Sequence, residues 1–241
     1  MSIKTRSHEI AAVLRTEILR NQYRPGERLP SERDLAARFN TNRGAIREAL
    51  KQLEQLGIIT IQPGGVRVLP KEEATLEILD HLLSLDGYPN PKLMDDYLQV
   101  FKMICVMSAA QTVERANDEQ RSFILNTITN MKNDPADHEL IREGWTTLFD
   151  YFLTITDNLV MRLIANGLGV QFLSQKKDMP NEPPIDEKVM RKILNGMIRA
   201  LKNNDAKLMG DIVSQYFDWV RIVFADILAS YQAPTKQAVG T

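Results

Sequence analysis

Residues 29–69 read LPSERDLAARFNTNRGAIREALKQLEQLGIITIQPGGVRVL, and this stretch decides the fold of the first part of the chain. Ser31 is a good N-cap with Asp34 three residues later, which predicts the start of a short helix. Residues 40–42 interrupt that helix. Asn42 can cap a second helix, in which the apolar residues keep helical spacing: Ile46, Ala49, Leu50, Leu53 and Leu56. The stretch therefore predicts two helices joined by a tight turn.

A β-hairpin is predicted after the second helix. Gly57 ends the helix, and two short β-type runs, 58–61 and 66–68, flank the turn sequence Pro63-Gly64-Gly65. Two helices followed by a two-stranded wing are the layout of a winged helix-turn-helix, in which the second helix enters the major groove of DNA. We expect residues 1–70 to form a domain of this kind that binds a double-stranded DNA operator.

Three strings at fixed spacing give this segment a family resemblance. They are PGERLPSERDLA at 25–36, NR at 42–43 and IREAL at 46–50. Over roughly residues 8–69 the chain resembles the DNA-binding domain of GntR-family transcriptional regulators. By position, the resemblance implies that six residues lie at the DNA: Arg33, Asn42, Arg43, Gly44, Arg47 and Gly64.

Roles can be expected for four of these positions. Arg33 and Arg43 are the expected base-edge contacts, because arginine can bond guanine through two nitrogens, and Arg47 is the expected phosphate contact. Gly64 would lie against the minor groove at the wing tip. Family members often have hydroxyl residues after the central arginine, whereas this chain has Gly44 and Ala45. That difference leaves fewer side-chain contacts to phosphate.

Charge is divided unequally along the chain. Residues 1–70 carry 12 Lys and Arg against 7 Asp and Glu, a net charge of +5, and the remainder carries 18 against 24, a net charge of −6. A basic first domain joined to an acidic second one fits a DNA-binding module attached to a domain that does not contact DNA. Ordinary scatter of charge is the alternative.

Residues 71–232 show helical periodicity and no convincing strand. We expect helices there at 72–86, 91–116, 118–132, 137–156, 158–176, 186–203 and 205–230, and a further helix in the first domain at 6–21. The fold class is therefore mainly α: a winged helix-turn-helix with a small β-hairpin wing, then an all-α bundle of six or seven helices. Residues 233–241 are expected to be a flexible tail.

The order and size of the two domains resemble the FadR branch of the GntR family. In that branch the C-terminal domain is a helical bundle called FCD. The resemblance implies a homodimer that reads a palindromic operator and responds to a small-molecule effector bound in the FCD bundle. A basic residue that FCD domains often place against a carboxylate falls on Phe101, with Lys102 beside it.

Many FCD domains hold a divalent metal through one Asp and three His. By position these histidines would fall on Phe149 and near Leu194 and Tyr216, none of which is a histidine. The three histidines of the chain are widely separated in the sequence: His8, His81 and His138. Imidazole is the usual nitrogen ligand for such a site. We therefore expect no metal and no cofactor.

Apolar side chains occupy the positions of the polar site. They could line a cavity for a long apolar ligand, and the candidate set is Phe149, Leu194, Met197, Tyr216, Trp219, Val220 and Phe224. Because the FadR branch includes regulators that respond to fatty-acyl-CoA, the expected effector is a fatty acid or an acyl-CoA. Two alternatives are a small carboxylate bound without a metal and a filled core in a constitutive DNA-binding dimer.

Other classes of protein find little support in the sequence. Gly64-Gly65 is not followed by Gly-Lys-Ser/Thr, and no nucleophile has a nearby histidine in a recognisable motif, so we expect no enzyme. The single cysteine, Cys105, excludes an intramolecular disulfide. The N-terminus lacks the apolar core of a signal peptide, and no uncharged apolar run approaches about 20 residues. We expect a cytoplasmic protein with no membrane contact.

Overall fold

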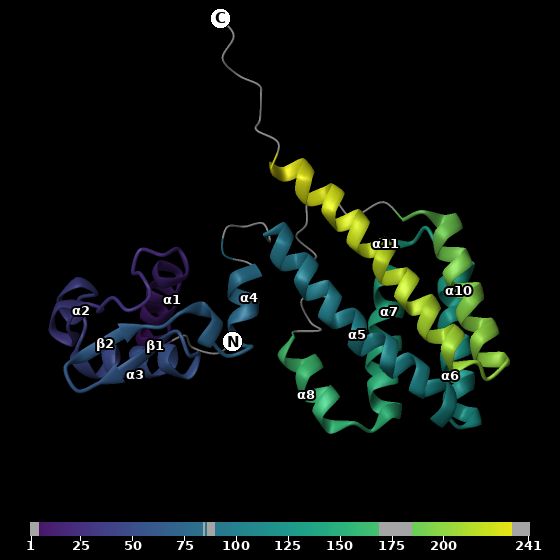
Figure 1. The fold of residues 1–241 in the computed structure, drawn as a ribbon, viewed down its shortest axis with the longest axis horizontal. Coiled ribbons are helices and arrows are strands. Elements are labelled where there is room, and N and C mark those ends of the chain that lie inside the picture. The colour runs from purple at the N-terminus through teal and green to yellow at the C-terminus, as the bar shows by residue number, and fades with distance from the viewer. Residues whose placement is uncertain (1–4, 84, 86–89, 169–184, 233–241) are drawn as a thin grey trace, which may run out of the picture. The chain divides into compact units, whose positions relative to one another are not determined.

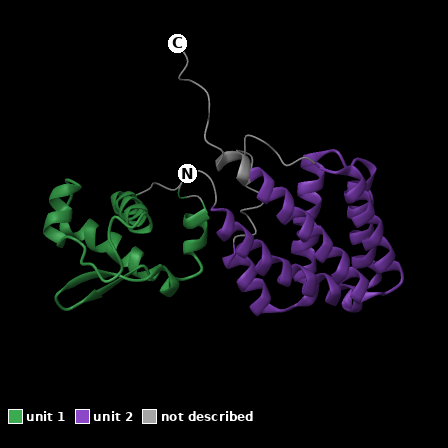
Figure 2. Cartoon of the chain, turned by 45° about the horizontal axis from the view of Figure 1, so that its top comes forward, with its two compact units in different colours: residues 1–87 green, residues 88–241 purple. Residues whose placement is uncertain are grey.

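The computed structural model describes residues 5–83, 85, 90–168 and 185–232, with side chains described as far as residue 227. The chain divides into two compact units, residues 1–87 and residues 88–241 (Figure 2). We call them the N-terminal unit and the C-terminal unit. The fold class predicted from the sequence is confirmed: a helix-turn-helix with a two-stranded hairpin is followed by a helical bundle (Figure 1).

The helix-turn-helix and its wing lie in the N-terminal unit. Its first elements are α1 (Arg6–Leu19), α2 (Glu32–Arg38), α3 (Arg43–Gln55), β1 (Ile59–Gln62) and β2 (Gly65–Val68). Both expected N-caps are confirmed, because the Ser31 side chain accepts from the Asp34 amide and the Asn42 side chain accepts from the Ala45 amide. The two strands pair antiparallel with Ile59 opposite Val68.

The core of this unit extends beyond the wing. After a 3-10 turn, η1 (Lys71–Glu73), the short helix α4 (Ile78–Leu83) adds Ile78 to the core that α1, α2, α3 and the hairpin form. The Thr75 amide donates to the Leu56 carbonyl at 2.9 Å, which ties this segment to the end of α3. The compact N-terminal unit therefore extends to residue 87, beyond the boundary after residue 70 that the sequence predicts.

One helix expected at 72–86 is replaced by η1 and the short α4. Ala74 between them is extended, with φ −69° and ψ 155°, because the chain passes close to the end of α3 there. Gly57 makes room for this passage: its φ is +71°, and a Cβ at this position would lie 3.0 Å from the Glu73 carbonyl oxygen. Only glycine accepts both conditions without strain.

The C-terminal unit is a bundle of long helices. They are α5 (Pro91–Arg115), α6 (Asp118–Asn133), α7 (His138–Thr156), α8 (Leu159–Gly167), α10 (Glu187–Lys202) and α11 (Ala206–Gln232). The helix α11 packs against α5 and α10, α5 also packs against α7, and α6 packs against α7 and α10 (Figure 1). The expected helices agree closely with these bounds. The later part of the helix expected at 158–176 and the expected tail at 233–241 lie outside the described residues.

Asparagine and aspartate side chains begin these helices. Asn117 and Gln120 form a complete capping box at α6, and Asn90, Asp137, Asn158 and Asp186 accept from first-turn amides of α5, α7, α8 and α10. Large side chains fill the interior between the helices, with Phe101, Phe152 and Phe217 at most 1% exposed. Among the described residues, no helix is both long and apolar enough to cross a bilayer.

Candidate DNA interface and helical-domain core

The first turn of α3 presents its residues to solvent. The Asn42 Oδ1 accepts from the Ala45 amide at 2.9 Å, which fixes the direction in which the helix begins. Arg43 and Gly44 occupy this first turn and are exposed. Within the described part of the chain, the Arg43 guanidinium has no hydrogen bond or ion pair. Its five donors are therefore available to a nucleic acid.

The other two expected arginines differ in how they are held. Arg33, in the first turn of α2, is 78% exposed and has only a long ion pair of 3.5 Å with Asp34. Arg47 donates from Nε to both Glu32 carboxylate oxygens at 2.9 Å, which joins α3 to α2. This hydrogen bond to Glu32 raises the pKa of the Arg47 guanidinium. Since only Nε makes the bond, the two Nη groups remain free to meet a phosphate.

Two glycines follow Pro63 at the wing tip. Gly64 and Gly65 have φ of +102° and +130°, values that residues with a Cβ rarely adopt. Gly64, the expected minor-groove contact, therefore offers peptide groups and no side chain. The structure places the six expected DNA residues on the turn before α3, on α2, on α3 and at the wing, all within the N-terminal unit.

Aromatic rings from three helices meet in the core of the C-terminal unit. The Trp145 ring stacks on Tyr216 with 3.8 Å between centroids and on Phe149 with 5.1 Å. Phe149 also contacts Phe101 and Phe217 at 6.2 and 5.4 Å, and Trp219 lies 6.2 Å from Tyr216. We call these residues the aromatic cluster, and they are Phe101, Trp145, Phe149, Tyr216, Phe217 and Trp219.

The seven residues expected at the effector fall partly within this cluster. Phe149, Tyr216 and Trp219 belong to it. Leu194 and Met197 are fully buried on α10, which packs against α11. On α11, Phe224 is buried and Val220 is partly exposed. Trp145 and Phe217 are not among the seven residues predicted from the sequence, although Trp145 stands one helical turn before Phe149 on the same apolar face.

One buried polar atom lies within the aromatic cluster. Trp145 is 3% exposed, and its Nε1 has no hydrogen-bond partner among the described residues. A buried donor without a partner costs about 1–3 kcal/mol, so such groups usually find an acceptor. A bound molecule that carries an oxygen acceptor would satisfy this donor.

The residues at the expected metal positions do not fit a metal ion. Phe149 and Leu194 have no ligand atom and are 4% and 0% exposed. The Tyr216 ring stacks on Trp145, and burial raises the pKa of its phenol, which stays protonated at neutral pH. Over the described ranges, no three His, Cys, Asp or Glu side chains gather as a metal site would require. In this respect the described part of the chain differs from the metal-binding FCD domains to which the sequence was compared.

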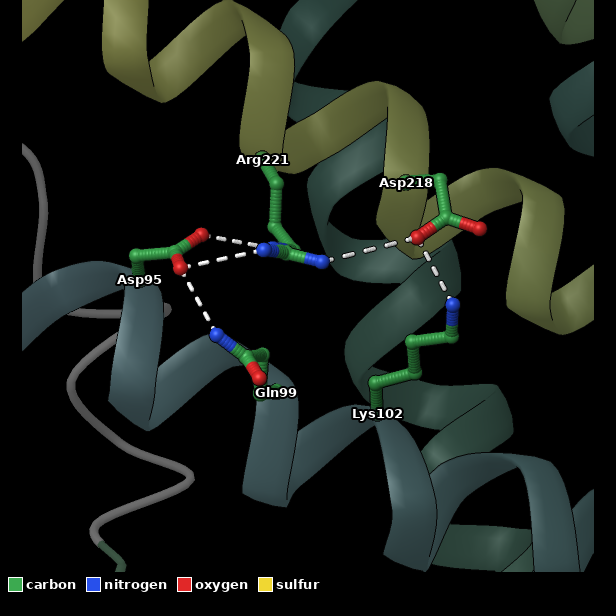
Figure 3. Close-up of polar contacts among 5 residues, drawn as sticks. All are labelled: Asp95, Gln99, Lys102, Asp218 and Arg221. Atoms are coloured by element: carbon green, nitrogen blue, oxygen red, sulfur yellow. Dashed lines mark hydrogen bonds and ion pairs between the residues drawn. The ribbon is translucent and has the colours of Figure 1, made fainter.

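A polar network joins α5 to α11 beside the core (Figure 3). Arg221 on α11 donates to both Asp95 oxygens on α5, from Nε at 2.6 Å and from Nη2 at 3.0 Å. Lys102 donates to Asp218 at 2.7 Å, and Gln99 donates to Asp95 at 2.7 Å. The hydrogen bond from Arg221 is the main reason that the pKa of Asp95 is lowered. Both cations are thus matched by carboxylates of their own chain.

With this geometry established, comparison with known proteins gives the family. The family described as bacterial regulatory proteins, gntR family, matches residues 6–68. Residues 6–68 are a GntR-family helix-turn-helix domain. This family consists of transcriptional regulators and not of enzymes, as expected from the sequence.

Two relatives match the chain over more residues than the N-terminal unit holds, so their similarity extends into the C-terminal unit. The HTH-type transcriptional regulator Mce2R of Mycobacterium tuberculosis is 25% identical over 166 residues, which are 68% of this chain and 69% of that protein. The fatty acid metabolism regulator protein of Escherichia coli is 30% identical over 154 residues, 63% of this chain. That match spans 62% of the E. coli protein, less than two thirds of its length.

A solved structure shows the same fold. A structure of Lar, which controls the expression of the Listeria monocytogenes agr system, matches with a TM-score of 0.55 and 13% identity. The match covers 94% of this chain and 100% of the Lar chain. The order of a winged helix-turn-helix and a helical bundle is therefore shared along almost the whole chain.

Proposed function

We propose that the whole chain is a GntR-family transcriptional regulator and that it binds a palindromic DNA operator as a homodimer in the cytoplasm. We further propose that a fatty acid or an acyl-CoA bound in the C-terminal unit changes its affinity for DNA. The observation that carries DNA binding is the pair of exposed arginines, Arg33 and Arg43, in the first turns of α2 and α3. Guanidinium groups held in this way can bond the edges of guanines in the major groove.

Support for a homodimer comes from an exposed apolar face on two helices that contact each other, α5 and α8. Seven large apolar side chains are 43–70% exposed there, and we call them the α5/α8 face: Val100, Met103, Met107, Leu159, Val160, Leu163 and Ile164. Contiguous exposed apolar patches larger than a few hundred Å² are rare on monomeric proteins, so a group of this kind favours an interaction surface.

The charges around this face favour a second copy of the chain as its partner. The only charged residue of α8 is Arg162, and its guanidinium donates to Asp150 on α7 at 2.5 Å. A face without unpaired charge on α8 can meet its own copy, because a two-fold axis brings the same patch of both copies together and no like charges then oppose each other. Two copies would place two helix-turn-helix modules on the two halves of a palindrome.

Two observations support an apolar effector in the C-terminal unit. The Trp145 Nε1 is a buried donor without a described partner, surrounded by rings from three helices. The cations of the network between α5 and α11, Arg221 and Lys102, are already paired with Asp95 and Asp218, which disfavours a small carboxylate as the main ligand. The name of the E. coli relative refers to fatty acid metabolism, which is consistent with an acyl ligand here.

Ligand binding can be tested through the two tryptophans of the chain, Trp145 and Trp219, since both belong to the aromatic cluster. We expect long-chain fatty acids or acyl-CoA to change tryptophan fluorescence and to raise the melting temperature. At a free ligand concentration of 100 times the Kd, the free energy of unfolding should increase by about 2.7 kcal/mol. Trp145→Phe keeps an aromatic ring at this position, removes the donor and should weaken binding. A response to small carboxylates alone would reject the acyl effector, and no response would favour a constitutive DNA-binding dimer.

A further inference from the structure

The wing contains a third extended segment that comes from an earlier part of the chain. Residues 27–29 run antiparallel beside β2: the Val68 amide donates to the Glu27 carbonyl and the Leu29 amide to the Val66 carbonyl, both at 3.0 Å. Arg28 forms an isolated bridge opposite Arg67. The loop before α2 is therefore part of the wing and holds Arg28 at a fixed place on it.

The side chain of Arg28 lies on the solvent face of this small sheet. Leu29 and Val66 are buried on the core face, and residues alternate between the two faces along a strand. Arg28 is accordingly exposed, in one row with Arg67 and Thr60 across the three extended segments. Its Nη2 lies 3.8 Å from the position that a Cβ would occupy at Gly64, so the guanidinium reaches the wing tip.

The two arginines of this row are not equivalent. The Arg67 Nη1 donates to the Gly26 carbonyl at 2.7 Å, which draws that guanidinium away from the tip. Arg28 makes no hydrogen bond or ion pair with any residue that the structure describes. Gly64 and Gly65 bring no side chain of their own. The charge that the wing tip can offer to DNA therefore comes from Arg28.

We propose that Arg28 contacts the minor groove beside Gly64 and gives the regulator a preference for A·T pairs at the outer positions of each half-site. This inference rests on the proposed DNA-binding function. A narrow, A·T-rich minor groove has an enhanced negative potential that attracts arginine. The two glycines let the backbone approach the groove closely, and the Arg28 guanidinium supplies the matching charge.

The test begins with the operator that the full-length protein selects from random DNA, and then compares Arg28→Ala, Arg28→Lys and Arg24→Ala. Arg24 is another exposed arginine of the same loop, outside the strand pairing, and serves as the matched control. Affinity is measured at several salt concentrations. Outer A·T pairs are replaced by G·C pairs, which add an amino group to the minor groove, and by inosine·C pairs, which lack that group.

For the wild-type protein we expect tighter binding to outer A·T and inosine·C pairs than to G·C pairs. Arg28→Ala should lose this difference and bind DNA at least about tenfold more weakly. It should also reduce the magnitude of the slope of log K against log salt by about 0.9, the value for one neutralised phosphate. Arg28→Lys should restore the salt slope and not the outer preference, because lysine lacks the planar fork. All variants should keep the wild-type sequence preference at the inner base pairs of the half-site.

A second result separates a failure of this inference from a failure of the proposed function. If Arg28→Ala keeps the wild-type salt slope and outer preference while its melting temperature is unchanged, Arg28 has no contact with DNA. If it loses affinity only in proportion to a lower melting temperature, and Arg28→Lys does the same, its role is confined to holding the wing together. A wild-type protein that selects no sequence at all would reject the DNA-binding proposal itself.

Discussion

Arg43 and Arg47 stand one helical turn apart on α3, and their surroundings differ. Arg43 is exposed with its donors free of described partners, whereas the Nε of Arg47 is bound to Glu32. A free planar guanidinium can read a base edge, while one anchored through Nε has its two Nη groups left for the backbone of DNA. At the scale of single residues, the same side chain is thus suited to two tasks by its neighbours.

Arg43→Ala should lose about 1–3 kcal/mol of binding free energy on one base pair of the half-site and relax the preference at that pair. Arg47→Ala should instead weaken binding about equally for all sequences and reduce the salt slope by about one. Fluorescence anisotropy with the selected operator and its single-pair variants measures both. Unchanged specificity in Arg43→Ala would reject its role as a base reader.

The end of α3 shows how one element limits the next. Gly57 adopts a φ of +71° and approaches the Glu73 carbonyl, so that η1 and α4 can return to the core at Ile78. A second example, within the C-terminal unit, is the contact of α5 with α11, where Arg221 donates to both oxygens of Asp95. In each case a local feature acts by holding two elements together.

Gly57→Ala should lower the free energy of unfolding by about 1–3 kcal/mol, because the positive φ and the close backbone of residues 73–74 both oppose a Cβ. Gly26→Ala is the matched control: its φ is +83°, but no atom lies within 4 Å of the added Cβ. Gly26→Ala should lower the free energy of unfolding only by the cost of placing a Cβ at a positive φ. Equal losses in urea denaturation for the two variants would show that the approach of residues 73–74 has no energetic weight.

Asp95 should make the stability of the C-terminal unit depend on pH. Its folded pKa is lowered, mainly by the Arg221 hydrogen bond, so its stabilising contribution is present above the unfolded value of about 3.9. That contribution is lost as pH falls through the lower folded pKa. Because Asp95 is 43% exposed, we expect Asp95→Asn to cost less than about 1 kcal/mol near pH 7.

Denaturation of the wild-type protein and Asp95→Asn between pH 7 and pH 3 measures this effect. The difference between the two should shrink as the pH drops below about 4. A difference that stays constant over this range would mean that the ion pair with Arg221 does not stabilise the fold. Thr129→Asn, an exposed change on α6, checks that the pH response belongs to Asp95.

At the scale of the whole molecule, the two units have surfaces of opposite character. The N-terminal unit presents arginines on α2, α3 and the wing, and the C-terminal unit presents the apolar α5/α8 face. A regulator that reads a palindrome needs both surfaces, one for DNA and one to hold two copies together. The shape of each surface arises within its own unit.

Met103→Lys combined with Leu163→Lys should weaken the proposed dimer by at least about 100-fold, because two like charges would be buried on each side of the interface. Native mass spectrometry and sedimentation over a concentration series measure the change. Val13→Lys is the control, since Val13 is a 42% exposed apolar residue of the N-terminal unit. Variants that remain dimers with wild-type affinity would move the interface elsewhere, and a monomeric wild-type protein would reject the dimer.

The sequence alone determined the fold class, the ends of most helices and the position of the wing, because these depend on neighbours within one or two turns. Caps such as Ser31, Asn42 and Asn117 bond amides three residues away, and apolar periodicity marks a buried face without saying what covers it. The arginines of the expected DNA surface were predicted differently, from the resemblance of motifs of fixed spacing to a known family.

Tertiary structure decided which distant residues meet. It placed α4 in the N-terminal unit, stacked Trp145 on Tyr216, joined Asp95 to Arg221 and brought Arg28 to Gly64. Each of these contacts joins segments that are far apart in the sequence, and each depends on how whole helices and strands pack. Local propensity does not predict such pairings, because they contribute to the free energy of folding only when the elements pack together.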